Sequence, residues 1–310
     1  MTNQQLKDHL ISQGWKESTA DIVAQWISTE KTVNEWRDTF VGSFLSDHPN
    51  SFHVLRRVIE ATGKKDPDWS DFTAQQLRII RDYISTEVTN NSVRFYMSQI
   101  KATLNLNADK VRVTQQQLKA ATHTKAEPTQ HVALTEEELE RIHRYVPRTA
   151  TERDVKREFM IEAYCGARNS DVQNLSLANV SDGWLTYVSQ KTRVKTSVPV
   201  HRNLLAYLTA DPGKPHAKKV IIETIQRICR AVGIDQPLEL FTKGRLQTGP
   251  KYSFIGSHTA RRSFASQLAV RGVPIAMIAK FMGHSSTDMT MRYICLQTDD
   301  IPADVKAFFN

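Results

Sequence analysis

The sequence of 310 residues has little cysteine and no long apolar run. Its three cysteines, Cys165, Cys229 and Cys295, lie far apart and form no C-x-x-C pair, which argues against a disulfide framework and a thiolate zinc site. The opening residues, MTNQQLKDHLISQGW, are too polar for a signal peptide, and no apolar stretch approaches the length that spans a membrane. These absences predict a cytoplasmic protein with reduced thiols and without a bound metal.

Basic residues outnumber acidic ones, with 41 Lys and Arg against 33 Asp and Glu, a net charge of +8. Residues 1–128 carry 16 basic and 15 acidic side chains, whereas residues 129–310 carry 25 and 18. The excess of seven positive charges (25 minus 18) in the second half favours a polyanionic partner there. Charge alone does not separate a DNA-binding surface from a solvated basic one.

The chain is long enough for two domains, each with its own core. Residues 1–45 read as helical and are either helices added to the next domain or a small separate module. Residues 46–120 are predicted to form a helical domain, and the polar residues 121–131, which include a proline, a linker. Residues 132–310 form the second predicted domain, with a C-terminal tail at 294–310.

Helix start signals are clear at two places. Thr73 and Thr135 each precede an amphipathic stretch, with Gln76 and Glu138 three residues later as partners in a capping box. Residues 182–201 alternate between apolar and polar side chains and are rich in β-branched and aromatic residues. This stretch predicts a β-hairpin, the only β-structure that the sequence indicates convincingly.

The stretch HTARRSFASQLAVRGVPIAMIAKFMGHSSTDMTMRY, residues 258–293, brings together residues suited to phosphodiester chemistry. His258 and Arg261 share one face of a predicted helix that ends at a glycine, and His284 and Tyr293 follow the next helix. Arginine presents a planar fork to phosphate oxygens, histidine exchanges protons near neutral pH, and tyrosine can act as a nucleophile. Each of these residues alone is commonplace, so the interpretation depends on their combination.

In combination, H-x-x-R, then G-H, then Y at this spacing resembles the C-terminal signature of the tyrosine recombinases, the lambda-integrase family. The resemblance also calls for an arginine in a G-x-R turn, and CGARNSDVQNL supplies Arg168, with Asp171 in the supporting acidic position. It calls as well for a lysine at the start of a β-hairpin loop. Lys191 matches that position best, and Lys195 is the alternative.

The resemblance implies a mainly helical fold with a small β-hairpin or sheet, in which a helical core-binding domain precedes an α+β catalytic domain. In the core-binding region, Arg94 and Lys101 are candidates for contacts with the DNA backbone, and Lys195 is a further candidate in the hairpin. Tyr96 is a further candidate for that surface, and the alternative is that Phe95 and Tyr96 are core residues and the charges are solvated. The implied catalytic residues are Arg168, Lys191, His258, Arg261, His284 and Tyr293.

The implied reaction is strand transfer without a metal, ATP or any other cofactor. Tyr293 would attack the scissile phosphate and form a 3′-phosphotyrosyl bond, while Lys191 would protonate the leaving 5′-oxygen. Both arginines and His284 would bind the non-bridging oxygens, and His258 would accept the tyrosine proton or orient the phenol.

The implied partner is double-stranded DNA at specific sites, bound by a homo-tetramer that is a monomer when free, with possible accessory DNA-bending or directionality factors. Residues 301–310 predict a short helix that docks on a neighbouring protomer or folds back on its own. Two other functions stay open. One is a DNA-relaxing enzyme like the type IB topoisomerases, and the other is a DNA-binding protein that kept the fold.

Overall fold

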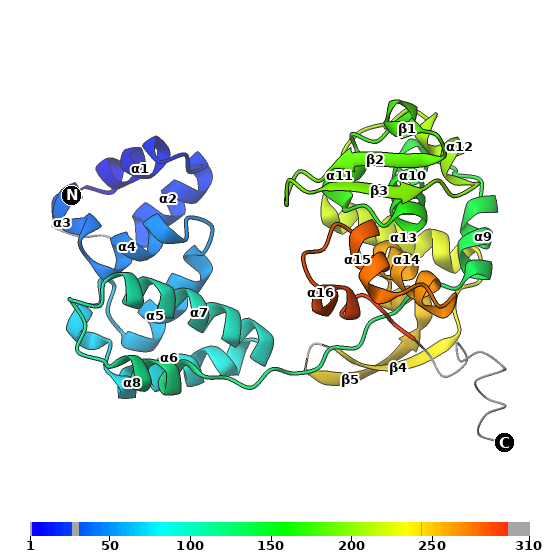
Figure 1. Cartoon of the computed structure of the whole chain (residues 1–310). Helices are drawn as coiled ribbons and strands as arrows, with labels where there is room; N and C mark the ends of the chain where they lie inside the picture. The colour runs from blue at the N-terminus through cyan, green and yellow to red at the C-terminus, as the bar shows by residue number, and fades with distance from the viewer. Residues whose placement is uncertain (1, 27–30, 243, 297–310) are drawn as a thin grey trace, which may run out of the picture. The chain divides into compact units, whose positions relative to one another are not determined.

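A computed structural model of the chain describes residues 2–26, 31–242 and 244–296 (Figure 1). The chain divides into two compact units, Met1–Pro128 and Thr129–Asn310. The predicted tail helix at 301–310 lies outside the described residues. Within the described part of the chain, no helix is both long and apolar enough to cross a membrane.

Among the described residues of the first unit, all regular structure is helical (Figure 1). One core joins Leu6 and Phe44 to Ile80 and Met97, so helices on both sides of residue 45 pack together. The α-helices are α1 Asn3–Ser12, α2 Glu17–Trp26, α3 Val33–Arg37, α4 Phe40–Asp47, α5 Phe52–Thr62, α6 Ala74–Glu87, α7 Asn90–Leu106 and α8 Gln115–Thr122.

Threonine caps begin many of these helices. A cap of this kind satisfies a backbone N–H that has no partner within the helix and contributes about 1 kcal/mol. The threonines whose hydroxyl oxygen accepts such a bond are Thr2, Thr32, Thr39, Thr73 and Thr114.

The segment that joins the units is attached to its own unit on each side. Helix α8 extends into the predicted linker, so its first two residues are helical. Beyond it, the Glu127 carboxylate accepts a hydrogen bond from Asn90 at 2.7 Å, and the Glu127 carbonyl accepts one from Asn91 at 2.9 Å. In the second unit, the Gln130 N–H donates to the Phe241 carbonyl, and the Phe241 N–H donates to Gln130 Oε1 at 2.7 Å.

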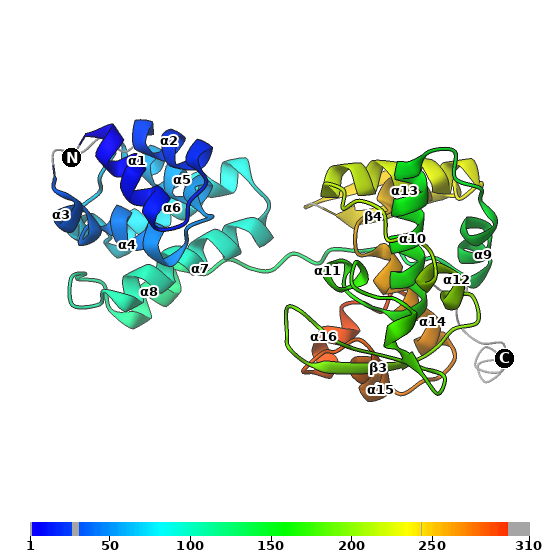
Figure 2. The ribbon, with the colours of Figure 1, turned by 90° about the horizontal axis from the view of Figure 1, so that it is seen from above.

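The second unit is built around α10, which packs against α12, α13 and α14 (Figure 2). Its elements are α9 Glu136–Arg144, α10 Ala150–Cys165, α11 Asn169–Val172, β1 Val180–Ser181, β2 Trp184–Val188, β3 Lys195–Pro199, α12 Leu204–Leu208, α13 Lys218–Ala231, β4 Pro237–Thr242, β5 Arg245–Pro250, α14 Thr259–Val270, α15 Ile275–Phe281 and α16 Thr287–Met291. The fold class is therefore the predicted one, mainly helical with small antiparallel sheets.

The predicted hairpin is present as strands β2 and β3, with β1 added at the edge of β2. Leu185 pairs with Val198 and Tyr187 with Thr196, and these four side chains face the core. The expectation that this hairpin is the only β-structure is wrong, because β4 and β5 form a second antiparallel pair. The sequence does not indicate this pair, because its two strands contain prolines and few β-branched residues. The turn between them contains Gly244 at φ 74°.

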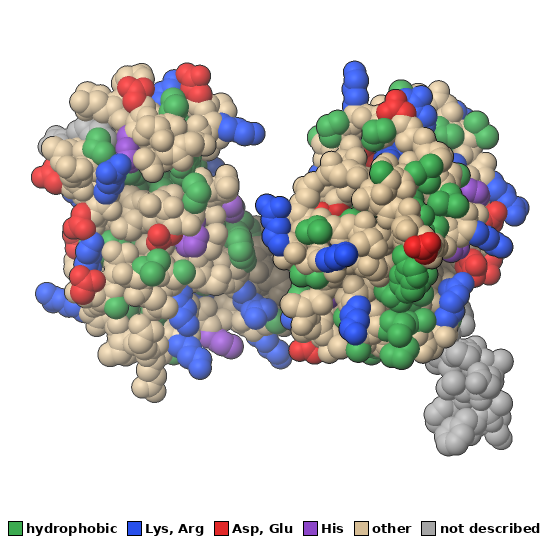
Figure 3. All heavy atoms as spheres, turned by 45° about the horizontal axis from the view of Figure 1, so that its top comes forward, with side chains coloured by type: hydrophobic (Ala, Val, Ile, Leu, Met, Phe, Trp, Pro, Cys, Tyr) green, Lys and Arg blue, Asp and Glu red, His purple; other side chains and the backbone are tan. Residues whose placement is uncertain are grey.

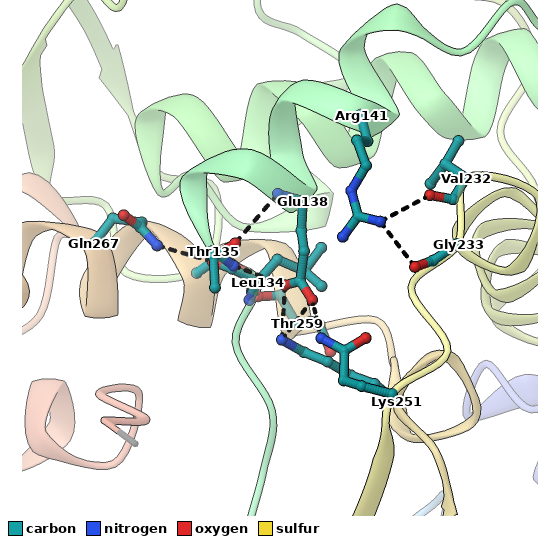
Figure 4. A network of polar contacts seen from close by, with 11 residues as sticks. Leu134, Thr135, Glu138, Arg141, Val232, Gly233, Lys251, Thr259 and Gln267 are labelled. Carbon is teal, nitrogen blue, oxygen red and sulfur yellow. Dashed lines mark hydrogen bonds and ion pairs between the residues drawn. The ribbon is translucent and has the colours of Figure 1, made fainter. Parts of the chain in front are cut away.

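A buried ion pair fixes the start of α9 (Figure 4). The capping box predicted between Thr135 and Glu138 is confirmed. The Glu138 carboxylate also accepts hydrogen bonds from Lys251 at 2.7 and 2.8 Å and from Gln236 at 2.6 Å. One carboxylate thus joins the N-terminus of α9 to the segment that follows β5.

The residues before α9 are attached to α14 (Figure 4). The Leu134 N–H donates to Ser263 Oγ at 2.8 Å, and Gln267 donates to the Leu134 carbonyl at 3.0 Å. Helix α14 carries Arg261 in its first turn. Its position therefore depends on contacts from the segment where the second unit begins.

Candidate active site

Arg261 is buried, with 1% of its surface exposed, and its guanidinium is held by three partners. It donates to the Gly166 carbonyl, to the Met282 carbonyl at 2.6 Å and to His284 Nε2 at 2.8 Å. The two carbonyls close the C-termini of α10 and α15, where helix dipoles favour a cation. Gly166 has φ 66°, and a Cβ there would overlap the ring of Phe264, so glycine permits the close approach of α14.

His284 is delivered by a second glycine that the fold requires. Gly283 has φ 60° and closes α15, and a Cβ at this position would lie 2.7 Å from Thr196 Oγ1 on strand β3. Both the backbone angle and the contact exclude larger residues. The chain therefore turns tightly against the sheet, and His284 emerges beside Arg261.

Both ring nitrogens of His284 have partners. Nε2 faces Arg261 Nη2, which can only donate, and Nδ1 lies 2.9 Å from Thr290 Oγ1. This arrangement assigns the proton to Nδ1. Burial, followed by the charges of Arg261 and Arg168, lowers the pKa of His284 to about 4. The imidazole is consequently neutral near pH 7.

Arg168 belongs to a hydrogen-bond network that extends into the hairpin. It donates to Ser189 Oγ at 3.0 Å and to the Gly283 carbonyl at 3.4 Å. Ser189 in turn donates to Asp171 Oδ2 at 3.0 Å, and the Gln190 N–H donates to Asp171 Oδ1 at 2.8 Å. Asp171 is 3% exposed. It thus fixes the hairpin turn relative to Arg168, and Ser189 is the connecting residue that sequence reasoning missed.

Lys191 follows Gln190 in the exposed turn, whereas Lys195 is the first residue of β3 and pairs with Val188. His258 occupies the N-cap position of α14 instead of lying within the helix, its side chain makes no capping hydrogen bond, and much of the residue is exposed. Partial burial of its ring lowers the pKa of His258, with further contributions from the charges of Arg262, Lys218, Arg261 and Lys191. Lys191 is therefore within electrostatic reach of His258.

Tyr293 follows α16, where its N–H donates to the Thr290 carbonyl at 2.8 Å. Its half-buried ring is surrounded by cationic and imidazole groups. The Arg261 Cζ lies 5.4 Å from the ring centroid, and the centroids of His284 and His258 lie at 5.2 and 6.3 Å. Five of the predicted catalytic residues, Arg168, His258, Arg261, His284 and Tyr293, thus border one region of the second unit, and Lys191 lies in the hairpin turn that Asp171 holds through Gln190.

The DNA-binding candidates of the first unit lie on α7. Arg94 is exposed and Lys101, seven residues later on the same face, is half-buried. Phe95 is 55% exposed, whereas Tyr96 packs against the core, so the two aromatic residues differ. Figure 3 shows Lys and Arg side chains distributed over the visible face of each unit. Lys195 is exposed at the hairpin.

Comparison with known proteins gives a consistent result. A profile of the phage integrase family matches residues 132–299. The integrase of Haemophilus phage HP1 (strain HP1c1) is 26% identical over 286 residues, which cover 88% of this chain and 78% of that protein. The tyrosine recombinase XerA of Pyrococcus furiosus is 25% identical over 178 residues, covering 52% of this chain and 56% of the relative.

Solved structures share the fold. A lambda integrase tetramer bound to a Holliday junction matches with a TM-score of 0.58 and 16% identity, covering 92% of this chain and 89% of that one. The XerH recombinase bound to a palindromic difH substrate matches with a TM-score of 0.58 and 12% identity, covering 100% and 85%. At these identities the likeness concerns the fold alone.

Proposed function

The chain belongs to the phage integrase family of tyrosine recombinases, and we propose that it cleaves and rejoins double-stranded DNA at specific sites through a 3′-phosphotyrosyl intermediate. The observation that carries this proposal is the placement of the buried Arg261 guanidinium between two helix C-termini, beside the Tyr293 ring. A fixed cation next to a phenol is suited to a phosphodiester that the phenol attacks.

The phosphate is bound by groups already held in place. Arg168 and Arg261 donate to the non-bridging oxygens, where bidentate N–H donors stabilise the charge of the transition state. His284 supplies a further hydrogen bond after its Nε2 exchanges Arg261 for phosphate and gains a proton. Asp171 acts through Ser189 by holding Arg168 and the hairpin turn in register.

In the chemical step, one bond to phosphorus forms as another breaks, and a proton is transferred at each of the two oxygens. The Tyr293 oxygen forms a bond to phosphorus as the bond to the 5′-oxygen breaks, and His258 accepts the phenolic proton. Lys191 protonates the leaving 5′-oxygen. Attack by a 5′-hydroxyl from another strand reverses the step, and the phosphotyrosyl bond conserves the energy of the original linkage.

Covalent capture on DNA tests this proposal. We expect the protein to become attached to a nicked duplex that carries its target site, and Tyr293→Phe to abolish the adduct while site binding is retained. Tyr252→Phe is the matched control, because Tyr252 is also half-buried and loses only its hydroxyl. Adducts that persist in Tyr293→Phe would exclude Tyr293 as the nucleophile. Relaxation of plasmid DNA without recombination would favour the topoisomerase-like function.

In this proposal the first unit contributes to DNA affinity through Arg94 and Lys101. Both lie on one face of α7, with the exposed Phe95 beside them. Replacing either basic residue by alanine should weaken binding to all sequences and reduce its salt dependence by about one phosphate contact. An unchanged salt dependence would remove that residue from the interface.

The assembly that we propose is a homo-tetramer on two DNA sites, formed from monomers. The described lambda integrase relative is a tetramer on a Holliday junction. In this chain the residues after the nucleophile, ICLQTDDIPADVKAFFN, include apolar side chains at roughly helical spacing, and we expect them to dock on a neighbouring protomer. Deleting residues 301–310 should weaken cooperative binding to paired sites and spare binding by a single protomer. Unchanged cooperativity with a lower melting temperature would place the tail on its own protomer.

A further inference from the structure

Arg262, the residue after Arg261, covers the ring of Tyr293 from a second position. Its Cζ lies 5.8 Å from the ring centroid, close to the 5.4 Å of Arg261. The bonding of the two side chains differs. The Arg261 guanidinium has three hydrogen-bond partners, whereas the Arg262 guanidinium forms no hydrogen bond or ion pair with any residue that the structure describes, and its buried Nε has no partner.

We propose that Arg262 is a positioning residue that holds the Tyr293 ring and stabilises the negative charge that the phenol oxygen acquires during attack. The inference rests on the proposed role of Tyr293 as the nucleophile. A guanidinium over an aromatic face is attracted by the electron density of the ring. That attraction grows as the phenol loses its proton, so the cation favours the reacting form over the resting one.

The surroundings of Arg262 support a role within the site. Its charge contributes to the lowered pKa values of His131 and His258, and it opposes the effect of burial on the pKa of Cys295. These three residues come from different parts of the second unit, so the guanidinium lies where those parts meet. The groups that face the Tyr293 ring are Arg261 and Arg262 of α14, His258 at its N-cap and His284 after α15.

A purely structural role is disfavoured by the bonding. A structural arginine in this unit, such as Arg157, donates to the Tyr207 and Leu175 carbonyls at 3.0 and 3.1 Å. No described carbonyl accepts a hydrogen bond from the Arg262 guanidinium. Removing its guanidinium therefore leaves no described acceptor unpaired, and the melting temperature should change little.

Single-turnover cleavage at saturating DNA tests the proposal. A cation–π contact in a partly desolvated site is worth roughly 1–2 kcal/mol, so Arg262→Gln should slow cleavage about tenfold at an unchanged dissociation constant. Arg262→Lys keeps the cation and should recover most of the rate. Arg292→Gln is the charge-matched control, because Arg292 is exposed and adjacent to Tyr293 in the chain. It should cleave at the wild-type rate.

A more acidic nucleophile provides a second readout that a structural defect would not share. A fluorinated tyrosine at position 293 has a more acidic phenol and should restore cleavage in Arg262→Gln more than it accelerates the wild type. A wild-type rate in Arg262→Gln, or a loss that neither lysine nor fluorotyrosine repairs, would overturn the proposal. Weaker DNA binding with a smaller salt dependence and a normal saturating rate would also overturn it, by making Arg262 a phosphate contact. Failure of the nucleophile assignment is separate, since it shows as adducts in Tyr293→Phe.

Discussion

The candidate site has two regions that differ in how firmly they are held. Arg261 and Arg168 are hydrogen-bonded to carbonyls and to the Ser189 hydroxyl before any DNA is present. Lys191 lies instead in an exposed turn, and His258 caps a helix with much of its surface open to solvent. In the proposed reaction, the firmly held groups bind the negatively charged phosphate, and the exposed groups donate or accept protons.

This difference follows from what each task requires. Stabilising charge on phosphate depends on donors that need no reorganisation when the charge develops, which favours buried and satisfied side chains. A general acid has to reach an oxygen that departs with the DNA strand, which favours a group on a turn.

The largest expected effect concerns the exposed region. Lys191→Ala should slow cleavage by about a hundredfold to ten-thousandfold, the contribution of a general acid, and leave stability unchanged. A substrate with a bridging 5′-sulfur should restore the rate, because a thiolate leaves without a proton. Lys195→Ala is the matched control in the same hairpin and should need no rescue. If the sulfur substrate rescued only Lys195→Ala, the general acid would be Lys195 and not Lys191.

Substitutions in the firmly held region should affect the cleavage rate and, at the buried Arg261, the stability as well. Arg168→Ala and Arg261→Ala should each slow cleavage about a hundredfold to a thousandfold, the scale for one transition-state donor. Arg261→Ala should in addition lower the free energy of unfolding by about 2 kcal/mol or more, since it leaves the buried Gly166 and Met282 carbonyls unpaired. Cleavage rates and urea unfolding measure the two effects. A rate within a few-fold of wild type would remove that arginine from the phosphate site.

The two arginines of the firmly held region are also the residues whose positions the sequence indicates most directly. Arg168 and Arg261 lie at fixed positions beside helix ends, so G-x-R and H-x-x-R locate them without knowledge of the fold. Ser189 has no such marker, because a hydroxyl joins Arg168 to Asp171 only after the hairpin packs on α11. Sequence spacing records local geometry and not the contacts between distant segments.

Helix α10 shows the same limit on a larger scale. Its sequence, ATERDVKREFMIEAYC, is rich in charged residues, yet most of its side chains are buried. Several of these charges have partners in other segments, as where Lys156 donates to the His143 and Tyr145 carbonyls at 2.7 and 2.6 Å. Composition cannot reveal such partners, so the central helix of this unit could not be identified from hydropathy.

A buried carboxyl group of α10, next to the firmly held region, predicts a smaller effect, a pH dependence of the free energy of unfolding. Glu162 accepts a hydrogen bond from Asn169, the residue after Arg168, at 3.0 Å, and burial raises the pKa of Glu162 from 4.5 to about 8. Between these values the native state retains a proton that the unfolded state releases. The free energy of unfolding therefore falls as pH rises, by at most about 1.4 kcal/mol per pH unit.

Glu162→Gln removes this proton linkage and keeps an acceptor for Asn169. Its free energy of unfolding, measured in urea at several pH values, should gain on that of the wild type as pH rises through this window. Glu223→Gln, at an exposed position of α13, is the control and should follow the wild type. Parallel curves for Glu162→Gln and wild type would mean that Glu162 is already ionised at neutral pH.

The smallest expected effect is the uptake of a fraction of a proton when DNA binds. It tests whether the protonation state of the firmly held region is already fixed before binding. In the free protein, His284 has a pKa of about 4 and accepts a hydrogen bond from Arg261 through Nε2. To donate to phosphate from that nitrogen, the ring must be protonated, and a nearby phosphate raises its pKa. Binding should therefore take up protons above about pH 4, with the uptake decreasing at higher pH as the bound form also loses its proton.

Calorimetry in buffers of different ionisation enthalpy measures this uptake. His284→Gln should reduce it, whereas His258→Gln controls for the second imidazole beside the Tyr293 ring. Equal uptake in His284→Gln and wild type would mean that His284 stays neutral on phosphate, so that the buried region receives DNA without a change in protonation.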